Sequence, residues 1–579
     1  MLNKSSAGSC VLSITQNAPE RIVLTLREML KWLMIALKVS LCSITCFLIK
    51  AIQVEYSYPK LDGDGEGGLP EEWINLPSLA LPDGAHNSDS DTIFFILPSR
   101  ECSGEAIFGI SCYRQIAAKD LVSKTDDVTR STVQKSVCVL SRVPLFGALR
   151  AKLEVITRAY FAERDFAKVE VLSQMYTNLC EMFDSDVIDE QAASIDISVQ
   201  ELFLCFRHRV LVLFKLLLLE KKVVFNISPV QLLGTTMVAL VSLYPKVLEE
   251  GLKFCAAPSQ LPDTDSHSQS EDEASNGSSD IGAASADGSN EGGEIVIPPS
   301  NAVLEGEPNM VKDTFGFPLS IFTKGYLFHP YLSISYLDMI RSNVVRAYAI
   351  GATNALFVTK KDLLDAIITI DEQNCGQIAL LDVNLKRELN LTSADLRFGD
   401  YIMKNIEDNR KSSALFEGSD EWLRLQMREY LLSMGASSRS DLTVAIADYG
   451  TAFIHSWRKT RNYRIWMAGP HEDLSGVVPG HAFAGQLGVY DVLLRVEHSV
   501  GGSEGARRAI SAITSTGKNI GETGNKVRQS LSSWLKSSPT NAEEATEELA
   551  DESKVKGISN WFRGSHRDDK PDTSSQPQS

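Results

Sequence analysis

The chain lacks the residue patterns by which catalytic and metal-binding proteins are usually found. Its 10 cysteines include no CxxC pair, and its 9 histidines show no HExxH or comparable ligand spacing. Scattered cysteines of this kind are typical of a reducing compartment. There is also no Walker motif, no nucleophile elbow and no candidate pair of catalytic carboxylates. We therefore predict no catalytic residue, no cofactor, no metal and no small-molecule substrate.

Positive charge is in deficit as well. The 57 basic and 74 acidic side chains give 57 − 74 = −17, which argues against general nucleic-acid binding. The segment "WRKTRNYRIW" at 457–466 has the basic and aromatic mixture that a nucleic-acid patch requires. In a long amphipathic helix, the same residues form a solvated face above buried Trp457 and Tyr463, and we favour that interpretation. We expect no nucleic acid among the partners.

A phosphate-binding glycine loop is equally poorly supported. Residues 63–68 match GxGxxG by letter. A dinucleotide site needs such a loop between a strand and a helix, with backbone amides facing the pyrophosphate. Here Asp62, Asp64 and Glu66 would repel that anion, and Pro70 follows at once. The pattern predicts a turn.

Uninterrupted apolar runs are short. In "LVLFKLLLLEKKVVFNISPVQLL" (211–233), a lysine and a charged triplet break the leucines into pieces far shorter than the roughly 20 residues of a membrane span. The pattern predicts a buried helix over 200–220, a strand at "VVFNI" and a second helix from Val230 to about Tyr244, with Ser228 and Pro229 as its cap and first turn. This order indicates a layered α/β core.

A second apolar stretch, "KWLMIALKVSLCSITCFLIK" at 31–50, leaves several interpretations open. Lys38 lies near its middle, and a charge there costs a span about 2.5–3.5 kcal/mol on insertion scales. The stretch also lies too far from Met1 for a typical cleaved signal peptide. A single span at 32–49 would make the chain an integral membrane protein. The alternatives are a buried helix or strand, or an atypical gene start.

The remaining patterns divide the chain into five parts. After an atypical extension, 1–50, strands at "IQVEYSYP", "DTIFFILP", "EAIFGISCYRQI" and Ser136–Ser141 and a helix from about Leu145 indicate a small α/β domain over 51–165. A second α/β domain, 166–375, contains an insert at about 257–300. We expect the insert to be disordered, because Asp263–Glu294 contain nine acidic residues and no Lys or Arg. Helical periodicity at "EWLRLQMREYLLSM" and over 442–466 indicates a mainly helical part, 376–498, followed by a flexible tail, 499–579.

Several segments resemble a known family. "LFKLLLLEKKVVFNISPVQLL" resembles the central block of DENN domains, a leucine-rich helix followed by a buried strand. Around it, "LPEEWINLPSLALPDGAH", "FGISCYRQI", "GFPLSIFTKGYLFHPYL", "GATNALF" and "ADLRFGDYI" resemble the Avl-type late-secretory DENN proteins, in order from about 53 to 500. The resemblance implies a fold of class α/β plus α. This is the tripartite DENN fold, with a longin-like upstream module, a central α/β module and a mainly helical downstream module.

The same resemblance implies a function in membrane trafficking. DENN proteins act as guanine-nucleotide exchange factors for Rab-type small GTPases, and the Avl-type branch is linked to transport from the Golgi or endosomes to the cell surface. We therefore expect a cytoplasmic Rab regulator, peripherally associated with Golgi, endosomal and secretory membranes. The alternative is a non-exchanging adaptor that binds a GTPase or a coat protein at membranes.

One feature departs from the family pattern. A longin-like module begins with a strand and a tight turn before the segment that corresponds to "VEYSYP". Here the preceding "CFLIKAIQ" contains no Gly, Asn or Pro to make that turn. Either the first strand is lost, or the start of the chain is unusual.

The tail has the pattern of a membrane-binding amphipathic segment over 505–536. Residues 505–538 carry six basic side chains and one acid, so 6 − 1 = +5. Three interior glycines make the segment a poor helix in water, because each costs about 1 kcal/mol. We expect it to bind an anionic membrane surface; packing on the protein or disorder are the alternatives. The expected contact residues are Arg507, Arg508, Ile510, Ile513, Lys518, Ile520, Lys526, Val527, Leu531, Trp534 and Leu535.

A double substitution in the tail tests this expectation. Ile513→Asp combined with Trp534→Ala removes two members of the apolar stripe and adds a negative charge. Co-sedimentation with anionic liposomes should weaken, while the thermal unfolding of the folded part stays unchanged. Undiminished liposome binding would contradict the expected membrane contact of the tail.

Overall fold

The computed structural model describes most of the chain between residues 40 and 498. The described residues are 40–46, 53–59, 69–84, 88–100, 102, 104–123, 131–182, 190–257, 308–412, 415–488, 490–491, 494–495 and 498. The chain divides after Gly485 into two units, and every helix and strand named below lies in the first of them. Apart from Ala257, the expected acidic insert and the expected tail lie outside the described residues.

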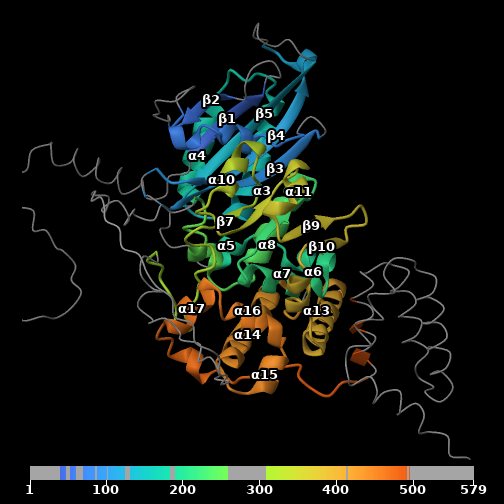
Figure 1. Cartoon of the computed structure of the whole chain (residues 1–579). Coiled ribbons are helices and arrows are strands. Elements are labelled where there is room, and N and C mark those ends of the chain that lie inside the picture. Colours follow the sequence, from blue (N-terminus) through green and yellow to red (C-terminus); the bar gives the residue numbers. More distant parts are fainter. Residues whose placement is uncertain are drawn as a thin grey trace, which may run out of the picture. The chain divides into compact units, whose positions relative to one another are not determined.

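The first sheet has five antiparallel strands in the order β2-β1-β5-β4-β3 (Figure 1). Its strands are β1 (Ser40–Cys46), β2 (Gln53–Tyr58), β3 (Ser90–Pro98), β4 (Ala106–Ala117) and β5 (Thr132–Ser141). The runs "IFFIL" and "VCVL" are buried on both faces, because helices cover this sheet and β3 also packs on a neighbouring helix and strand. The strand patterns predicted for β2 to β5 are confirmed.

Strand β1 lies between β2 and β5 and pairs with both. Of the two alternatives for the start of the chain, loss of the first strand is therefore wrong. Residues 47–52, between β1 and β2 in the sequence, lie outside the described residues. β1 also falls within 32–49, the stretch considered as a membrane span. Among the described residues, no helix is both long enough and apolar enough to cross a membrane.

Helices cover the first sheet. Helix α3 packs on β4 and β5, with Phe146, Leu149 and Leu153 buried at three- and four-residue steps. Helix α4 packs on β1 and β2, and α2 packs on β3 and β4. The bounds of these helices are α2 (Leu76–Ala80), α3 (Phe146–Ala162) and α4 (Glu170–Met182), and α5 (Glu190–Ser194) packs on α3. Together with the five strands they make up the first-sheet region.

The leucine-rich stretch forms the core of the next region. Its helix was predicted as one element over 200–220, but the structure has two, α6 (Val199–Phe206) and α7 (Arg209–Leu218). The chain breaks at Arg207, whose φ is 51°, and a Cβ on Gly399 would lie 2.5 Å from the ring of His208. Gly399 belongs to helix α13 (Ser393–Lys411), which packs against the chain at this break. Hydrophobic periodicity does not reveal a tertiary contact of this kind. The leucines themselves are buried, as predicted.

The second sheet is mostly parallel and has the order β10-β9-β6-β8-β7. Helices α10 and α11 contribute to the apolar cluster over its β6–β8–β7 face, around Val224, Tyr348 and Phe357. Strand β10 lies in the range expected to be mainly helical and forms a hairpin with β9. The elements are β6 (Lys222–Phe225), α8 (Val230–Val241), β7 (Tyr326–His329), α10 (Leu337–Arg341), β8 (Ala347–Gly351), α11 (Leu356–Thr359), β9 (Ala366–Ile370) and β10 (Gly376–Leu380). With α6 and α7 they make up the second-sheet region.

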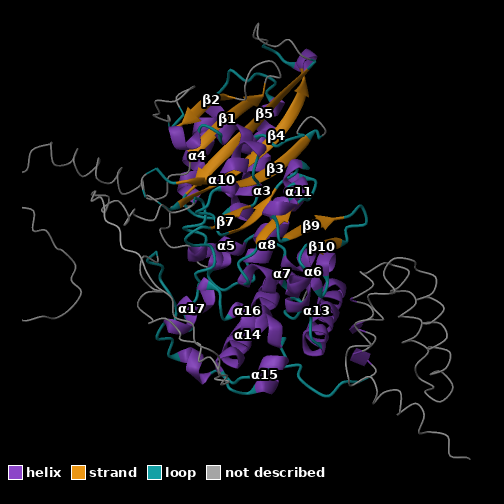
Figure 2. Ribbon diagram, viewed as in Figure 1, coloured by secondary structure: helices purple, strands orange, loops and turns teal. Residues whose placement is uncertain are grey.

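The helical region follows β10, and Figure 2 shows it as helices joined by loops. It contains α12 (Val383–Glu388), α13 (Ser393–Lys411), α14 (Asp420–Arg439), α15 (Thr443–Ala447), α16 (Thr451–Trp457) and α17 (Arg461–Ala468). Helices occupy most of 442–466, as predicted, but the long amphipathic helix considered for 457–466 is wrong, because that stretch is divided between α16 and α17. Gly450 has a φ of 93°, and the Thr460 side chain caps the new helix by accepting from Tyr463 N. The α/β plus α composition is confirmed.

We predict that Leu217→Asp destabilises the folded unit by about 4 kcal/mol or more, because Leu217 is 1% exposed and the new charge finds no partner. Urea unfolding followed by circular dichroism measures the change. Leu442→Asp is the matched control: that leucine is 60% exposed, and its substitution should leave the midpoint nearly unchanged. A stable Leu217→Asp protein would contradict the core assignment.

Candidate functional site

Buried polar groups gather where the three regions meet. Among the described residues, no group of His, Cys, Asp or Glu has an arrangement that could hold a metal ion. Burial lowers the pKa of His208 and of His329 to about 4, so both rings are neutral at physiological pH. His329 Nε2 lies 2.9 Å from the carbonyl oxygen of Ala256, a structural contact. The polar contacts that join the three regions form the candidate site instead.

The first joint is made by Asp91 of β3 at the start of α8. Its carboxylate accepts hydrogen bonds from Val230 N (3.1 Å) and Gln231 N (2.9 Å). Burial raises the pKa of Asp91, and its backbone hydrogen bonds oppose this rise. Ser228, predicted as the helix cap, is exposed and does not cap α8, which has Pro229 at its N-cap position. A carboxylate from another region satisfies the free amides instead.

Further contacts fix the same joint. A Cβ added to Gly234 of α8 would lie 3.0 Å from the ring of Phe94, so helix and sheet touch closely there. Asp83 N donates to the hydroxyl of Tyr331 at 2.9 Å, and Asn354 Nδ2 donates to the Asp83 carboxylate at 3.1 Å. The first-sheet and second-sheet regions are thus joined by packing and by hydrogen bonds.

The second joint is a buried ion pair between α7 and α13. Lys215 Nζ lies 2.6 Å from Asp395 Oδ2, and the two side chains are 1% and 0% exposed. Lys215 also donates to the carbonyl oxygen of Tyr449 at 3.0 Å. The hydroxyl of Tyr430 donates to Asp395 Oδ1 at 2.7 Å, and Thr392 N donates to Oδ2 in a capping box. One carboxylate thereby joins α7 to two helices of the helical region.

The pKa of Asp395 depends on its burial and on the basic side chains beside it. Burial alone would raise the pKa of Asp395, but Lys215 and His481 together outweigh burial and hold it well below the ordinary value of 3.8. His481 Nε2 lies 3.6 Å from Asp395 Oδ1. The carboxylate therefore stays ionised, and Lys215 has its counter-ion within a core that excludes water.

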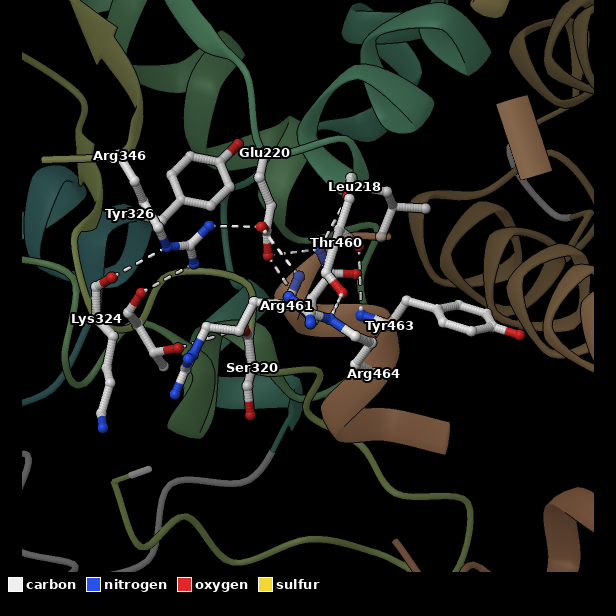
Figure 3. Close-up of polar contacts among 12 residues, drawn as sticks. Leu218, Glu220, Ser320, Lys324, Tyr326, Arg346, Thr460, Arg461, Tyr463 and Arg464 are labelled. Carbon is white, nitrogen blue, oxygen red and sulfur yellow. Dashed lines mark hydrogen bonds and ion pairs between the residues drawn. The ribbon is translucent and has the colours of Figure 1, made fainter. Parts of the chain in front are cut away.

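Glu220 makes the third joint, at the end of the leucine-rich helix (Figure 3). Its Oε1 accepts from Asn462 N and Nδ2, both at 2.9 Å, and its Oε2 accepts from Arg461 N at 3.1 Å. The guanidinium of Arg346 donates to the same carboxylate. Glu220 has a φ of 54°, an uncommon conformation for a residue other than glycine, and these contacts hold it there. The carboxylate joins α7, the start of β8 and the start of α17.

The sequence-predicted site residues lie elsewhere. All eleven expected membrane-contact residues, from Arg507 to Leu535, fall outside the described residues. The joints built by Asp91, Glu220 and the Lys215–Asp395 pair were not predicted. Two signals were present in the sequence: a lone lysine inside a run of core leucines requires a buried partner, and Thr392 with Asp395 has capping-box spacing.

Comparison with known proteins identifies the family to which the chain belongs. The family model described as transport protein Avl9 matches residues 41–438, more than half of the 579 residues. The chain belongs to this family, and the predicted Avl-type resemblance is confirmed.

Two curated relatives show how far the similarity extends. The late secretory pathway protein avl9 of Schizosaccharomyces pombe is 30% identical over 455 residues, which cover 75% of this chain and 87% of the relative. The late secretory pathway protein AVL9 of Saccharomyces cerevisiae is 26% identical over 482 residues, which cover 74% of this chain and 58% of that protein.

We predict that Asp395→Asn lowers the free energy of unfolding by about 3–5 kcal/mol at neutral pH, because Lys215 stays buried without its counter-ion. The folded pKa of Asp395 lies below its unfolded value of 3.8, so the pair stabilises fully above that pH and loses its contribution as pH falls toward the folded pKa. The difference in free energy of unfolding between the unsubstituted protein and Asp395→Asn should stay constant down to about pH 5 and become smaller below about pH 4. Urea unfolding at a series of pH values measures it.

The exposed pair Asp408–Lys411 supplies the control. Its side chains are 50% and 73% exposed, so Asp408→Asn should cause no measurable change. Adding Lys215→Met to Asp395→Asn should restore part of the lost stability by removing the unpaired cation. An Asp395→Asn protein as stable as the Asp408→Asn control would show that the buried pair does not join the regions.

Proposed function

We propose that the chain regulates membrane trafficking in the late secretory pathway, between the Golgi or endosomes and the cell surface. Membership in the Avl9 family carries this proposal, since both relatives are named late secretory pathway proteins. The proposed activity is that of a DENN-type guanine-nucleotide exchange factor for a Rab-type small GTPase. The proposed location is the cytoplasmic surface of secretory membranes.

The order of the three regions supports the DENN assignment. An antiparallel sheet with its helices is followed by a mostly parallel sheet and then by a group of helices. This is the order that a longin-like module, a central α/β module and a helical module would give. On this proposal, the joints at Asp91, Lys215 and Glu220 fix the three modules relative to one another.

Nucleotide exchange places a physical demand on such joints. An exchange factor needs no catalytic acid or base, because it binds the nucleotide-free GTPase more tightly than the loaded form. Each tenfold gain in release requires about 1.4 kcal/mol of differential binding energy. A surface that deformed as easily as the GTPase would lose part of that energy to its own rearrangement. Buried ionic joints between modules fit a surface that keeps its shape.

One exposed loop has the properties of a protein contact. Leu415 and Phe416 are 44% and 53% exposed, yet their loop is firmly held. Asn409 Nδ2 donates to the carbonyl oxygens of Leu415 (2.6 Å) and Glu417 (3.1 Å), and Gln200 Nε2 donates to that of Gly418 (2.7 Å). Adjacent exposed apolar side chains on a preorganised loop are typical of interface anchors. We include this loop in the proposed GTPase surface.

Nucleotide release from a panel of purified Rab proteins tests the proposal. The full chain should accelerate release from at least one member, and Leu415→Ser with Phe416→Ser should reduce that rate about tenfold or more by removing an anchor. Leu442→Ser, at a 60% exposed leucine beside α15, is the matched control and should retain the full rate. Binding without accelerated release from any member would favour the adaptor function.

A further inference from the structure

Strand β10 forms an edge of the second sheet. In the strand order β10-β9-β6-β8-β7, the two outer strands are β10 and β7. Strand β7 packs beside β3 of the first sheet, whereas no described strand lies beyond β10 (Figure 2). An edge strand presents a row of peptide groups with which another strand can pair. The open edge of this sheet is therefore the side of β10 that faces away from β9.

The hydrogen bonds at the two ends of β10 show that its odd-numbered positions bond toward β9. Asp371 N donates to the carbonyl oxygen of Cys375 at 3.1 Å, and Leu381 N donates to that of Asp365 at 2.9 Å. In an antiparallel pair, residues that bond to the neighbouring strand alternate with residues whose peptide groups point the other way. The even-numbered residues of β10 therefore turn their peptide groups toward the open edge.

The even-numbered residues are Gly376, Ile378 and Leu380. The Gly376 carbonyl oxygen accepts from Arg209 Nη1 at 2.9 Å, which agrees with this direction and occupies that position. Among the described residues, the amides and carbonyls of Ile378 and Leu380 have no hydrogen-bond partner. Both residues are partly exposed, so each chain carries two donors and two acceptors that are ready to pair with another strand.

Strand β10 has none of the features that usually protect a sheet edge. Such edges are commonly protected by a charged residue, a proline or a bulge. The strand sequence "GQIAL" contains no charged residue and no proline, and its register with β9 is unbroken. Leu381 and Val383, which follow the strand, are 38% and 77% exposed, so apolar surface continues beyond it.

We propose that β10 pairs with β10 of a second copy of this chain, in antiparallel direction about a twofold axis. With Ala379 on the axis, Ile378 of each copy faces Leu380 of the other, and each of these pairs exchanges two hydrogen bonds. All the unpaired peptide groups of both copies are then used, and the two five-stranded sheets become continuous. The same patch serves both copies, as a twofold dimer requires.

The exposed charges at the two ends of β10 suit this antiparallel arrangement. Glu372 lies in the hairpin turn before β10, and Lys386 and Arg387 lie in the last turn of α12 after it. All three are exposed. The nearby acids Asp382 and Glu388 accept hydrogen bonds within their own chain. An antiparallel pair directs the hairpin end of each copy toward the α12 end of the other, so opposite charges approach each other.

The net charge of the chain does not prevent this contact. Each copy carries −17, and like charges repel. At physiological ionic strength the repulsion between exposed charges falls off over about 8 Å, so the residues at the edge itself decide whether two copies pair. An uncharged edge with opposite charges at its two ends fits a second copy better than it fits a strongly acidic or strongly basic partner.

Sedimentation equilibrium of the full-length chain tests the proposal. The unsubstituted protein should form a dimer. Ile378→Pro should raise its dissociation constant at least about tenfold, because the dimer loses one hydrogen bond from each copy. The Ile378 amide does not bond to β9, and proline is tolerated at a sheet edge, so thermal unfolding followed by circular dichroism should stay nearly unchanged.

A charge pair at the axis gives a second test, which depends on the register. Ala379 is exposed, and in the proposed dimer the two Ala379 side chains lie directly opposite each other. Ala379→Lys and Ala379→Glu should each weaken self-association, because like charges then face each other. A mixture of the two variants should form a mixed dimer at least about threefold tighter than either variant alone. Ala159→Lys and Ala159→Glu, at an exposed position of α3, are the matched controls and should dimerise like the unsubstituted protein, mixed or separate.

The possible outcomes separate the alternatives. A full-length chain that sediments as a monomer throughout the loading range would overturn the proposal, and so would a dimer that neither Ile378→Pro nor the Ala379 variants weaken. If Ile378→Pro unfolds the sheet, the exposed Ala379 variants decide. Loss of binding to a Rab protein with unchanged self-association would assign the edge to that partner and overturn the second-copy assignment. Self-association requires no GTPase, so a chain without exchange activity would leave the dimer prediction standing.

Discussion

The buried ion pair between Lys215 and Asp395 is the interaction on which the described fold most depends. It places a cation inside α7, where every residue from Val210 to Leu218 is buried, and the two side chains of the pair are 1% and 0% exposed. The desolvation of Lys215 is offset only when α13 supplies Asp395 and the Tyr449 carbonyl comes within reach. The leucine-rich core is therefore complete only with the helical region packed against it. This dependence makes the two regions one folding unit.

Glu220, just beyond the C-terminal end of α7, makes a joint of the same kind. Its carboxylate satisfies the first amides of α17 and fixes Arg346, so two helices and a strand take their positions from one side chain. Asp91 does the same for α8 from the first sheet. In all three joints a carboxylate from one region binds either the backbone amides at the start of a helix or a charged side chain of another region. Such joints specify relative placement, because a shifted partner leaves a buried charge unpaired.

The elements that local pattern determines were predictable. The strands β2 to β5 and the helix α3 follow from apolar runs and turn residues, whereas β1 was not predicted. The break at Arg207 was not predictable from periodicity, and the contact beside it joins His208 to Gly399, which lies 191 positions later (399 − 208). The breaks within 442–466 were not predictable, because the apolar spacing continues through Gly450, whose φ of 93° marks the start of α16. Periodicity reports burial but does not report where the chain turns.

The candidate site shows the same limit more strongly. The letters "WRKTRNYRIW" gave Trp457 and Tyr463 as buried, and both are buried. They could not show that the amides of Arg461 and Asn462 meet a carboxylate 241 and 242 positions away. That contact fixes the first turn of α17, because the same carboxylate that accepts from these amides also binds the Arg346 guanidinium. Charge composition is readable from sequence, whereas charge convergence is a property of the fold.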